Sequence, residues 1–348
     1  METPTTAKNE TNPAGLTLAD YKGKPSTLCP GCGHNVVSNQ IQAAVFEMGL
    51  VPETIAKFSG IGCSSKSLNY FLGRSFGFNS LHGRMPNLAT GASFADTSIK
   101  ILGISGDGDT ASIGLGHFKH LIRRNLPMIY LIENNGVYGL TKGQFSATTD
   151  YGLELKHQGK NLFPPLDLCL EALLSGATFV ARTFSGDTRQ LKELIKAAFA
   201  HKGISVIDII SPCVTFNNKD EALQSYNFGR ENEKPIQNIK VFMKNEDFDL
   251  GEFEEGSTRQ VELADGSVIF LKKIEHDYDP TDRSAALDLL LESYKKQYFS
   301  TGLIYVEENV KPTLHEMFNL VDEPLNRLTE DRIRPERSVL DQINQSLG

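Results

Sequence analysis

Five cysteines in a chain of 348 residues raise the first chemical question. Cys29 and Cys32 enclose a Pro-Gly pair in the stretch TLCPGCGH, and His34 follows at once. A C-x-x-C pair is typical of a thioredoxin-like redox site, half of a zinc site, half of an iron–sulfur site or a disulfide. The spacing by itself leaves these four alternatives open.

Two further cysteines follow runs that are predicted to be buried strands, Cys63 in GIGCSSK and Cys213 in IISPC. Because the carboxyl ends of parallel strands meet at one edge of a sheet, we expect their thiols to lie near the C-x-x-C pair. Cys169, in LDLCLEALL, falls on the apolar face of a predicted helix and is expected to be a core residue. Four convergent thiols suit structural zinc or a [4Fe–4S] cluster, and a thioredoxin-like site would leave two of them unexplained.

The stretch GISGDGDTASIG follows a predicted strand and opens a predicted helix, an arrangement that presents backbone amides to a diphosphate. Residues 106–111 satisfy the dinucleotide fingerprint G-x-G-x-x-A, and Glu133 ends the next strand with a carboxylate suited to a ribose. A nicotinamide cofactor is therefore one candidate. Asp107 and Asp109 argue against it, because two carboxylates in this turn would repel a diphosphate unless a cation lay between them.

Oxygen ligands after the next strand fit such a cation. The stretch ENNGVYG brings the side-chain amide of Asn135 and the backbone carbonyl of Val137 to the strand end that adjoins Asp107. Mg²⁺ prefers oxygen ligands and often joins protein carboxylates to ligand phosphates. Asp and Asn also shape turns and helix caps, which is the structural alternative.

Composition excludes several classes of protein. The formal charge of −8 and the pI near 5.6 provide no broad basic surface, so neither nucleic acid nor an anionic membrane is an expected partner. The N-terminus has no apolar run, and no stretch approaches transmembrane length. We therefore expect a cytoplasmic protein, and a reducing compartment disfavours the disulfide alternative.

The elements that must position these residues alternate between strands and helices. The runs TIAKFSGIGC, IKILGISG, PMIYLIENN and ISVIDIISPC predict buried strands, and helical spacing follows Cys32, covers residues 110–124 and continues in TRQLKELIKAAFAHKG. This alternation predicts an α/β fold with a mainly parallel sheet and flanking helices.

Composition also suggests three regions. Residues 1–20 form a polar N-terminal arm, residues 21–214 an α/β domain, and residues 215–348 a C-terminal extension packed on the core or on a partner. In the extension, RQVELADGSVIFLKK predicts a hairpin that turns at Asp265 and Gly266, and helices are expected after it.

The motifs CPGCGH, GIGCSSK, HGRMPNLATG, GDGD, ENNGVYGLTKGQ and SPC occur in this order. Together they resemble the β subunits of 2-oxoacid:ferredoxin oxidoreductases, and TGLIYVEEN with the long C-terminus resembles the 2-oxoglutarate type. The resemblance runs from about residue 20 to beyond residue 300 and implies the thiamine diphosphate-binding fold. It also implies thiamine diphosphate, Mg²⁺ and one [4Fe–4S] cluster as cofactors, because an iron–sulfur centre can remove electrons from thiamine chemistry and zinc cannot.

The resemblance assigns residues to these cofactors. The cluster ligands would be Cys29, Cys32, Cys63 and Cys213, and the magnesium ligands Asp107, Asn135 and Val137. Contacts to thiamine diphosphate would come from Ile61, Gly62, Cys63, Ser64, His82, Gly108, Asp109, Gly139 and Leu140.

Five further polar residues near these motifs need separate treatment. His82 is expected to contact the cofactor and to be catalytic, whereas Arg84 in the same loop also suits a surface ion pair. Lys66 and Lys142 follow the two cofactor loops and are candidate catalytic residues that pair with a substrate carboxylate. The role of His34 stays undecided, since a histidine at the start of a helix is often structural.

The implied activity is oxidative decarboxylation of a 2-oxoacid with coenzyme A, reversible and linked to ferredoxin. An α subunit would bring the pyrimidine-binding domain, which one α/β unit does not supply. 2-Oxoglutarate is the expected substrate, with pyruvate or a broad range of 2-oxoacids as the alternative. More distant alternatives are a nicotinamide dehydrogenase, a non-redox thiamine diphosphate decarboxylase subunit and a zinc-stabilised binding module without enzymatic activity.

Overall fold

The computed structural model describes residues 11–156, 158–220, 222–242, 258–263, 268–273, 278–309 and 311–347. An eight-stranded sheet forms the centre, in the order β11-β15-β9-β10-β4-β3-β1-β2. Its strands are β1 (Ile55–Ser59), β2 (Phe76–Asn79), β3 (Lys100–Gly106), β4 (Met128–Asn134), β9 (Phe179–Phe184), β10 (Ile204–Ile210), β11 (Glu233–Pro235) and β15 (Phe299–Val306).

The sheet is parallel except where β15 runs antiparallel to β9. Every residue of β4 and β10 is buried, which explains their continuous apolar runs, because both faces of a parallel sheet are covered. The four strands predicted from the sequence are β1, β3, β4 and β10. The prediction of a mainly parallel α/β sheet is therefore confirmed.

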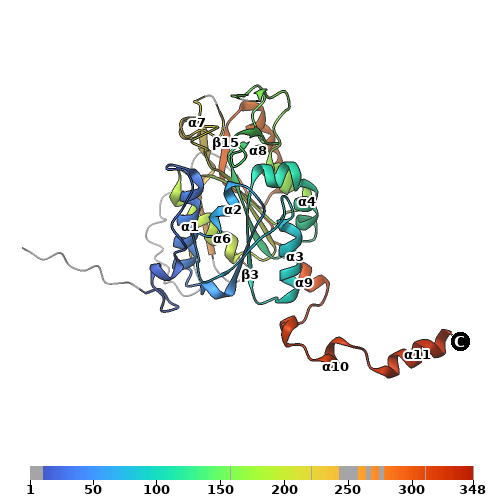
Figure 1. Ribbon diagram of the computed structural model, residues 1–348. Coiled ribbons are helices and arrows are strands. Elements are labelled where there is room, and N and C mark those ends of the chain that lie inside the picture. The colour runs from blue at the N-terminus through green and yellow to red at the C-terminus, as the bar shows by residue number, and fades with distance from the viewer. Residues whose placement is uncertain are drawn as a thin grey trace, which may run out of the picture.

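Helices cover both faces of this sheet (Figure 1). Their bounds are α1 (Gly33–Glu47), α2 (Cys63–Ser67), α3 (Met85–Ala95), α4 (Leu115–Arg123), α5 (Leu168–Ser175), α6 (Thr188–Ala200), α7 (Tyr226–Asn232), α8 (Arg283–Lys296), α9 (Leu314–Met317), α10 (Glu330–Ile333) and α11 (Arg337–Leu347). The helices predicted after Cys32 and within TRQLKELIKAAFAHKG are α1 and α6.

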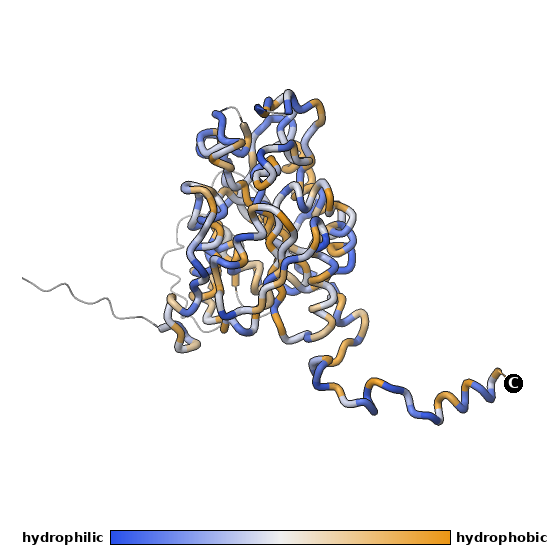
Figure 2. The backbone as a smooth tube through the Cα atoms, in the orientation of Figure 1, coloured by the Kyte–Doolittle hydropathy of each residue, from blue (hydrophilic) through white to orange (hydrophobic). Residues whose placement is uncertain are grey.

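Two apolar cores separate the layers, and Figure 2 shows hydrophobic segments within the body of the molecule. Helices α1 and α6 pack on one face through residues such as Val37 and Leu194. Helices α3, α4, α5 and α8 pack on the other, and Cys169 lies in that core, fully buried, as expected. The apolar stripe of each helix therefore faces the sheet.

The helix predicted over residues 110–124 is divided. A π-helical turn, η3 (Gly108–Ile113), comes first, and α4 begins after Gly114. Gly114 packs so closely that an added Cβ would lie 2.5 Å from the carbonyl oxygen of Asp109. Helical periodicity encodes neither this close approach nor the break.

The chain after residue 214 contributes to the central sheet, since β11 and β15 form one of its ends. A second sheet has the order β12-β14-β13, with β12 (Gln237–Phe242), β13 (Thr258–Glu262) and β14 (Val268–Lys273). Strands β13 and β14 pair antiparallel, as the predicted hairpin requires. Its expected turn at Asp265 and Gly266 lies outside the described residues.

The two ends of the described chain differ in their contacts with the body of the molecule. Of the expected N-terminal arm, residues 1–10 lie outside the described residues, and Asn12 donates hydrogen bonds to the hydroxyl of Tyr21 and the carbonyl of Phe46. Helices α10 and α11 extend away from the body (Figure 1), and none of their residues is buried. Among the described residues, no helix has the length and apolarity needed to cross a bilayer.

Short paired strands lie in the loops beyond the carboxyl ends of the main strands. They are β5 (Val137–Tyr138), β6 (Gln144–Phe145), β7 (Glu154–Leu155) and β8 (Gly159–Lys160). Helix α2 starts at the same edge, and the buried ammonium of Lys57 holds the segment after it by donating to the carbonyls of Leu68, Phe71 and Leu72. These contacts place the cofactor loops predicted from the sequence at one edge.

Candidate functional site

The carboxyl ends of β1, β3 and β4 open into one cavity of about 80 Å³. Every residue expected to contact thiamine diphosphate lines this cavity, and so do the three expected magnesium ligands. Its lining is His34, Ile61, Gly62, Cys63, Ser64, His82, Gly106, Asp107, Gly108, Asp109, Asn135, Val137, Tyr138, Gly139, Leu140 and Thr141. The motifs that the sequence placed at one edge are thus brought together.

Asp107 lies directly after β3 and is 1% exposed. Its Oδ1 accepts the backbone N–H of Asn135 at 3.1 Å, and its Oδ2 accepts the hydroxyl of Thr148 at 2.7 Å. Burial raises the pKa of this carboxyl, and the hydrogen bonds oppose that rise. A carboxylate can accept further contacts at each oxygen, so these bonds leave room for a metal ion.

Asn135 and Val137 are fixed beside Asp107 by a local turn. Gly136 adopts a φ of +67°, and the backbone N–H of Val137 donates to the side-chain oxygen of Asn135 at 3.1 Å. Asn217 donates to the Asn135 carbonyl at 2.9 Å. The carboxylate, the amide oxygen and the nearby carbonyl are hard oxygen donors, and this donor set fits Mg²⁺.

Asp109 has a structural task that the sequence did not reveal. Its carboxylate accepts the N–H of Gly83 at 2.6 Å, the hydroxyl of Ser105 at 2.8 Å and the N–H of Ile61 at 3.4 Å, and it contacts Nδ1 of His82. It therefore joins three loops at the mouth of the cavity. His82 is half-buried there, so its position agrees with the expected contact to the cofactor.

Cys63 and Cys213 border the same space, and a backbone hydrogen bond joins the residue after Cys32 to the residue before Cys213. A Cβ added to Gly139 would lie 3.6 Å from the sulfurs of both Cys63 and Cys213. The N–H of Gly33, directly after Cys32, donates to the carbonyl of Pro212 at 3.4 Å. The absence of a side chain at Gly139 therefore keeps space open between two thiols.

Cys29 lies in the exposed part of the same region, where the hydroxyl of Thr215 is 3.5 Å from its sulfur. Burial raises the pKa of Cys32 to about 12, and nearby Cys63 and Cys213 contribute to that rise. Burial likewise raises the pKa of Cys63 to about 11, with smaller contributions from Cys213 and Cys29. A bound cation would therefore favour the thiolate forms of Cys32 and Cys63.

Cys169 lies apart from these four, since its charged neighbours are Arg182, Asp208 and Asp167. Within the described ranges, no three His, Cys, Asp or Glu side chains are grouped as a ready metal site. The fit of a cluster thus depends on the chemistry of the thiols: cationic iron would stabilise the thiolates of Cys32 and Cys63, which burial disfavours.

His34 lines the cavity and lies close to the buried carboxyl group of Glu133. Nδ1 of His34 is 2.7 Å from the Ser211 hydroxyl, and its Nε2 is 3.8 Å from Glu133. Burial lowers the pKa of His34 to about 4 and raises the pKa of Glu133 well above its usual value. Glu133 is 0% exposed and accepts from Ser67, so it is not available to a ribose, which weakens the nicotinamide alternative.

The cationic candidates lie outside the cavity lining. Lys66 is half-buried on α2, close enough to Cys63 to lower the pKa of that thiol. Lys142 is exposed and adopts a φ of +77°. Arg84 donates to the carbonyls of Gly83 and Ile113, which makes it a loop contact.

Sequence analysis missed two residues of this site. The hydroxyl of Tyr138 donates to the Gly108 carbonyl at 2.9 Å, and the ring of Tyr138 occupies the space where a Cβ at position 108 would lie. Tyr138 stands within ENNGVYG, so its place in a motif was a usable signal. Thr148 stands outside every motif, and nothing in its spacing indicated its contact with Asp107.

Known proteins resemble the part of the chain that forms this site. Residues 60–209 match the family model described as "Thiamine pyrophosphate enzyme, C-terminal TPP binding domain". The chain is 41% identical over 202 residues to the 2-oxoacid:ferredoxin oxidoreductase subunit beta of Saccharolobus solfataricus, a match covering 58% of this chain and 66% of that one. The match therefore spans just under two thirds of that relative's length.

Other matches are more extensive. The chain is 36% identical over 222 residues to the 2-oxoglutarate synthase subunit KorB of Methanocaldococcus jannaschii, covering 64% of this chain and 78% of that one. It also resembles the solved 2-oxoglutarate:ferredoxin oxidoreductase from Magnetococcus marinus, with 30% identity and a TM-score of 0.74. That likeness covers 94% of this chain and 96% of the other. That structure has 2-oxoglutarate, coenzyme A and succinyl-CoA bound.

Gly60 tests the role assigned to Asp109. A Cβ at position 60 would lie 1.8 Å from Oδ2 of Asp109, so Gly60→Ala must displace this carboxylate. We expect the free energy of unfolding to fall by about 1–3 kcal/mol in denaturant titration, as for other overpacked sites. Gly91→Ala is the matched control, because nothing lies within 4 Å of its added Cβ. Equal stabilities of the two variants would contradict the role of Asp109.

Proposed function

This chain belongs to the family of 2-oxoacid:ferredoxin oxidoreductase β subunits, and we propose that it binds the thiamine diphosphate of a complex acting on 2-oxoglutarate. The complex would convert 2-oxoglutarate and coenzyme A to succinyl-CoA and carbon dioxide, in a reversible reaction that passes an electron pair to ferredoxin. The observation that carries the proposal is the cavity within the matched thiamine pyrophosphate domain, which gathers all the expected cofactor contacts.

The named relatives support 2-oxoglutarate as the substrate. The KorB match and the solved structure are both described by 2-oxoglutarate, whereas the Saccharolobus protein is described by 2-oxoacids in general. Pyruvate or a broad range of 2-oxoacids is the competing proposal. Relative rates of the purified complex with 2-oxoglutarate and pyruvate distinguish the two.

The residues present fit the proposed cofactors, and each has a definable task. Asp107, Asn135 and Val137 would hold Mg²⁺ against the diphosphate, while Gly108 and Gly139 allow close approach of the backbone. When bound, thiamine diphosphate supplies a carbon nucleophile for the 2-oxo group, and the iron–sulfur cluster accepts electrons. Asp109 and Tyr138 would keep the loops in place and water out.

A [4Fe–4S] cluster held by Cys29, Cys32, Cys63 and Cys213 is the proposed electron outlet. Support comes from the space beside Gly139, between the sulfurs of Cys63 and Cys213, and from burial that opposes ionisation of thiols without a cation. Cys63 also lines the cofactor cavity, so the electron path from cofactor to cluster would be short. A reducing cytoplasm, the proposed location, keeps these thiols available.

The small cavity suggests that a partner completes the site. Ligand pockets usually enclose about 300–1,000 Å³, and the cavity encloses about 80 Å³. Four exposed apolar residues lie in or next to the lining of the cavity, and we call this set the mouth rim: Ile61, Leu81, Ile113 and Leu140. Ile61 and Leu140 line the cavity, Leu81 precedes the lining residue His82, and Ile113 lies against Gly83. We propose that an α subunit with a pyrimidine-binding domain covers the mouth rim.

Activity of the purified complex tests the proposal as a whole. We expect this chain to co-purify with a larger partner, and the complex to reduce ferredoxin or a viologen dye in the presence of both 2-oxoacid and coenzyme A. The partner-free chain should be inactive, because it supplies half of the site. Turnover by a verified partner-free preparation, or turnover that ignores coenzyme A, would contradict the proposal.

Serine substitutions test the cluster ligands. Replacing Cys29, Cys32, Cys63 or Cys213 by Ser should remove a thiolate from the cluster and sharply reduce iron, sulfide and the brown absorbance of anaerobically purified complex. Cys169→Ser is the matched control and should retain all three. Stoichiometric zinc without sulfide in the native complex would favour a structural zinc site, and equal loss in all five variants would refute the choice of ligands.

A substitution of Leu81 tests whether the mouth rim contacts the α subunit. Leu81 is 77% exposed beside the cavity, and Leu81→Asp should weaken association with the α subunit by about 10-fold or more if it contacts that partner centrally. Leu174→Asp is the control, because Leu174 is 59% exposed near the opposite edge of the sheet. Quantified co-purification provides the measurement. Equal retention of the α subunit by both variants would exclude Leu81 from the interface.

Substitutions of two lysines near the cofactor loops test substrate recognition. A buried carboxylate needs a partner, since leaving it unpaired costs several kcal/mol, and Lys66 and Lys142 are the proposed partners of the distal carboxylate. Either Lys→Met variant should lower kcat/KM for 2-oxoglutarate about 10-fold more than for 2-oxobutyrate, a loss of roughly 1.4 kcal/mol. Lys100→Met, at the other edge, should change neither. Equal losses on both substrates would assign the lysines to shared chemistry.

A further inference from the structure

Thr148 lies in a turn after β6 and is buried against the metal site. Its hydroxyl oxygen is 2.7 Å from Oδ2 of Asp107, 3.1 Å from the side-chain oxygen of Asn134 and 3.1 Å from the hydroxyl of Ser146. A hydroxyl has one hydrogen to donate. The nearer, charged acceptor is favoured, so the donor bond goes to Asp107.

The turn that carries Thr148 is fixed by contacts of its own. Gln224 donates to the Thr148 carbonyl at 3.2 Å, and the hydroxyl of Thr149 donates to the Gly136 carbonyl at 2.5 Å. Asn161 donates to the Thr149 carbonyl at 2.9 Å. The Thr148 hydroxyl is therefore held in position by bonds that do not involve Asp107.

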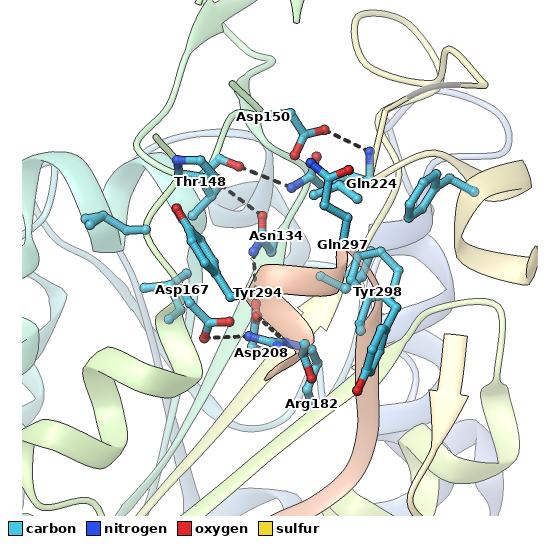
Figure 3. Close-up of a pocket in the computed structure, with 18 of the residues that line it drawn as sticks. Asn134, Thr148, Asp150, Asp167, Arg182, Asp208, Gln224, Tyr294, Gln297 and Tyr298 are labelled. Carbon is cyan, nitrogen blue, oxygen red and sulfur yellow. Dashed lines mark hydrogen bonds and ion pairs between the residues drawn. The ribbon is translucent and has the colours of Figure 1, made fainter. Parts of the chain in front are cut away.

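A chain of buried polar contacts continues behind Thr148, as Figure 3 shows. Asn134 donates to Oδ1 of Asp208 at 3.0 Å. Nε of Arg182 donates to Oδ2 of Asp208, also at 3.0 Å. Nη2 of Arg182 donates to Asp167 at 2.7 Å. The bond to Asp208 orients the side-chain amide of Asn134, whose oxygen lies near the Thr148 hydroxyl.

These residues line a second cavity, of about 450 Å³. Its size suits a ligand, but Asp150, Asp167 and Asp208 outnumber Arg182 among the charged side chains of its lining. An excess of negative charge disfavours anions such as 2-oxoglutarate or coenzyme A. The larger cavity is therefore a poor candidate for the substrate site, and its polar chain is best explained as support for the neighbouring metal site.

We propose that Thr148 is a positioning residue for magnesium: its hydroxyl holds the carboxylate of Asp107 in one orientation. The inference rests on the proposed function, because Asp107 is a magnesium ligand in that proposal. Asp107 accepts the N–H of Asn135 at Oδ1 and the hydroxyl of Thr148 at Oδ2. The carboxylate is thus oriented before the metal binds, and binding needs no further ordering of this group.

The test measures metal binding separately from activity. The complex of this chain with its co-purified partner is stripped of Mg²⁺, and calorimetry gives the Mg²⁺ affinity in the presence of thiamine diphosphate. Thr148→Val keeps the size of the side chain and removes the hydroxyl. We expect Mg²⁺ to bind about 10-fold to 100-fold more weakly, the usual effect of losing a group that orients a metal ligand.

Further variants separate positioning from folding. Thr148→Ser retains the hydroxyl and should restore affinity to near that of the wild type. Thr178→Val is the matched control, since Thr178 is buried near the opposite edge and bonds the Ile204 carbonyl at 3.1 Å. It should leave Mg²⁺ affinity unchanged. If Thr148→Val fails to fold, Thr148→Ala takes its place as the hydroxyl-free variant.

Two results would overturn the inference alone: unchanged Mg²⁺ affinity in the hydroxyl-free variant, or a Thr148→Ser variant as weak as Thr148→Val. In either case the wild-type complex would still bind thiamine diphosphate with Mg²⁺, and the proposed function would stand. A wild-type complex that binds thiamine diphosphate without any dependence on Mg²⁺ would instead overturn the metal assignment, and this inference with it.

Discussion

The site depends on the carboxylate of Asp109, because this group joins loops that follow different strands. It accepts hydrogen bonds from Gly83, Ser105 and Ile61 and contacts His82. Through this contact, the loop after β1, the loop after β2 and the turn after β3 share one partner at the mouth. The positions of the cofactor residues predicted in these three segments therefore depend on a buried acidic group that the fold must compensate with donors.

Burial also explains why cations are central to the proposed chemistry. Asp107 and the thiols of Cys32 and Cys63 lie where the low dielectric disfavours their charged forms, and burial raises the pKa of each. Hydrogen bonds from Thr148 and Asn135 compensate Asp107 in part. Magnesium and iron would complete the compensation, so metal binding is expected to be coupled to the charged forms of these groups.

The same edge has an apolar side. The mouth rim lies in or next to the lining of a cavity too small for a typical cofactor-sized ligand, while the larger cavity nearby has an excess of carboxylates. A subunit that binds half of a cofactor needs exposed apolar surface around it, because its partner must exclude water from the reacting atoms. The proposed chemistry and the proposed contact with a partner therefore both depend on the loops at this edge of the sheet.

The sequence alone determined which residues would meet. Strands such as β3 and β4 are apolar throughout, GDGD and ENNG follow them directly, and parallel strands bring such ends to one edge. Tertiary structure decided what each side chain does there. It turned Asp109 toward the loops, enclosed Glu133, left Lys142 exposed and brought Thr148 against Asp107 from a separate turn. Strand periodicity fixes where a residue lies, whereas the direction and partners of its side chain depend on loops that pack from distant parts of the chain.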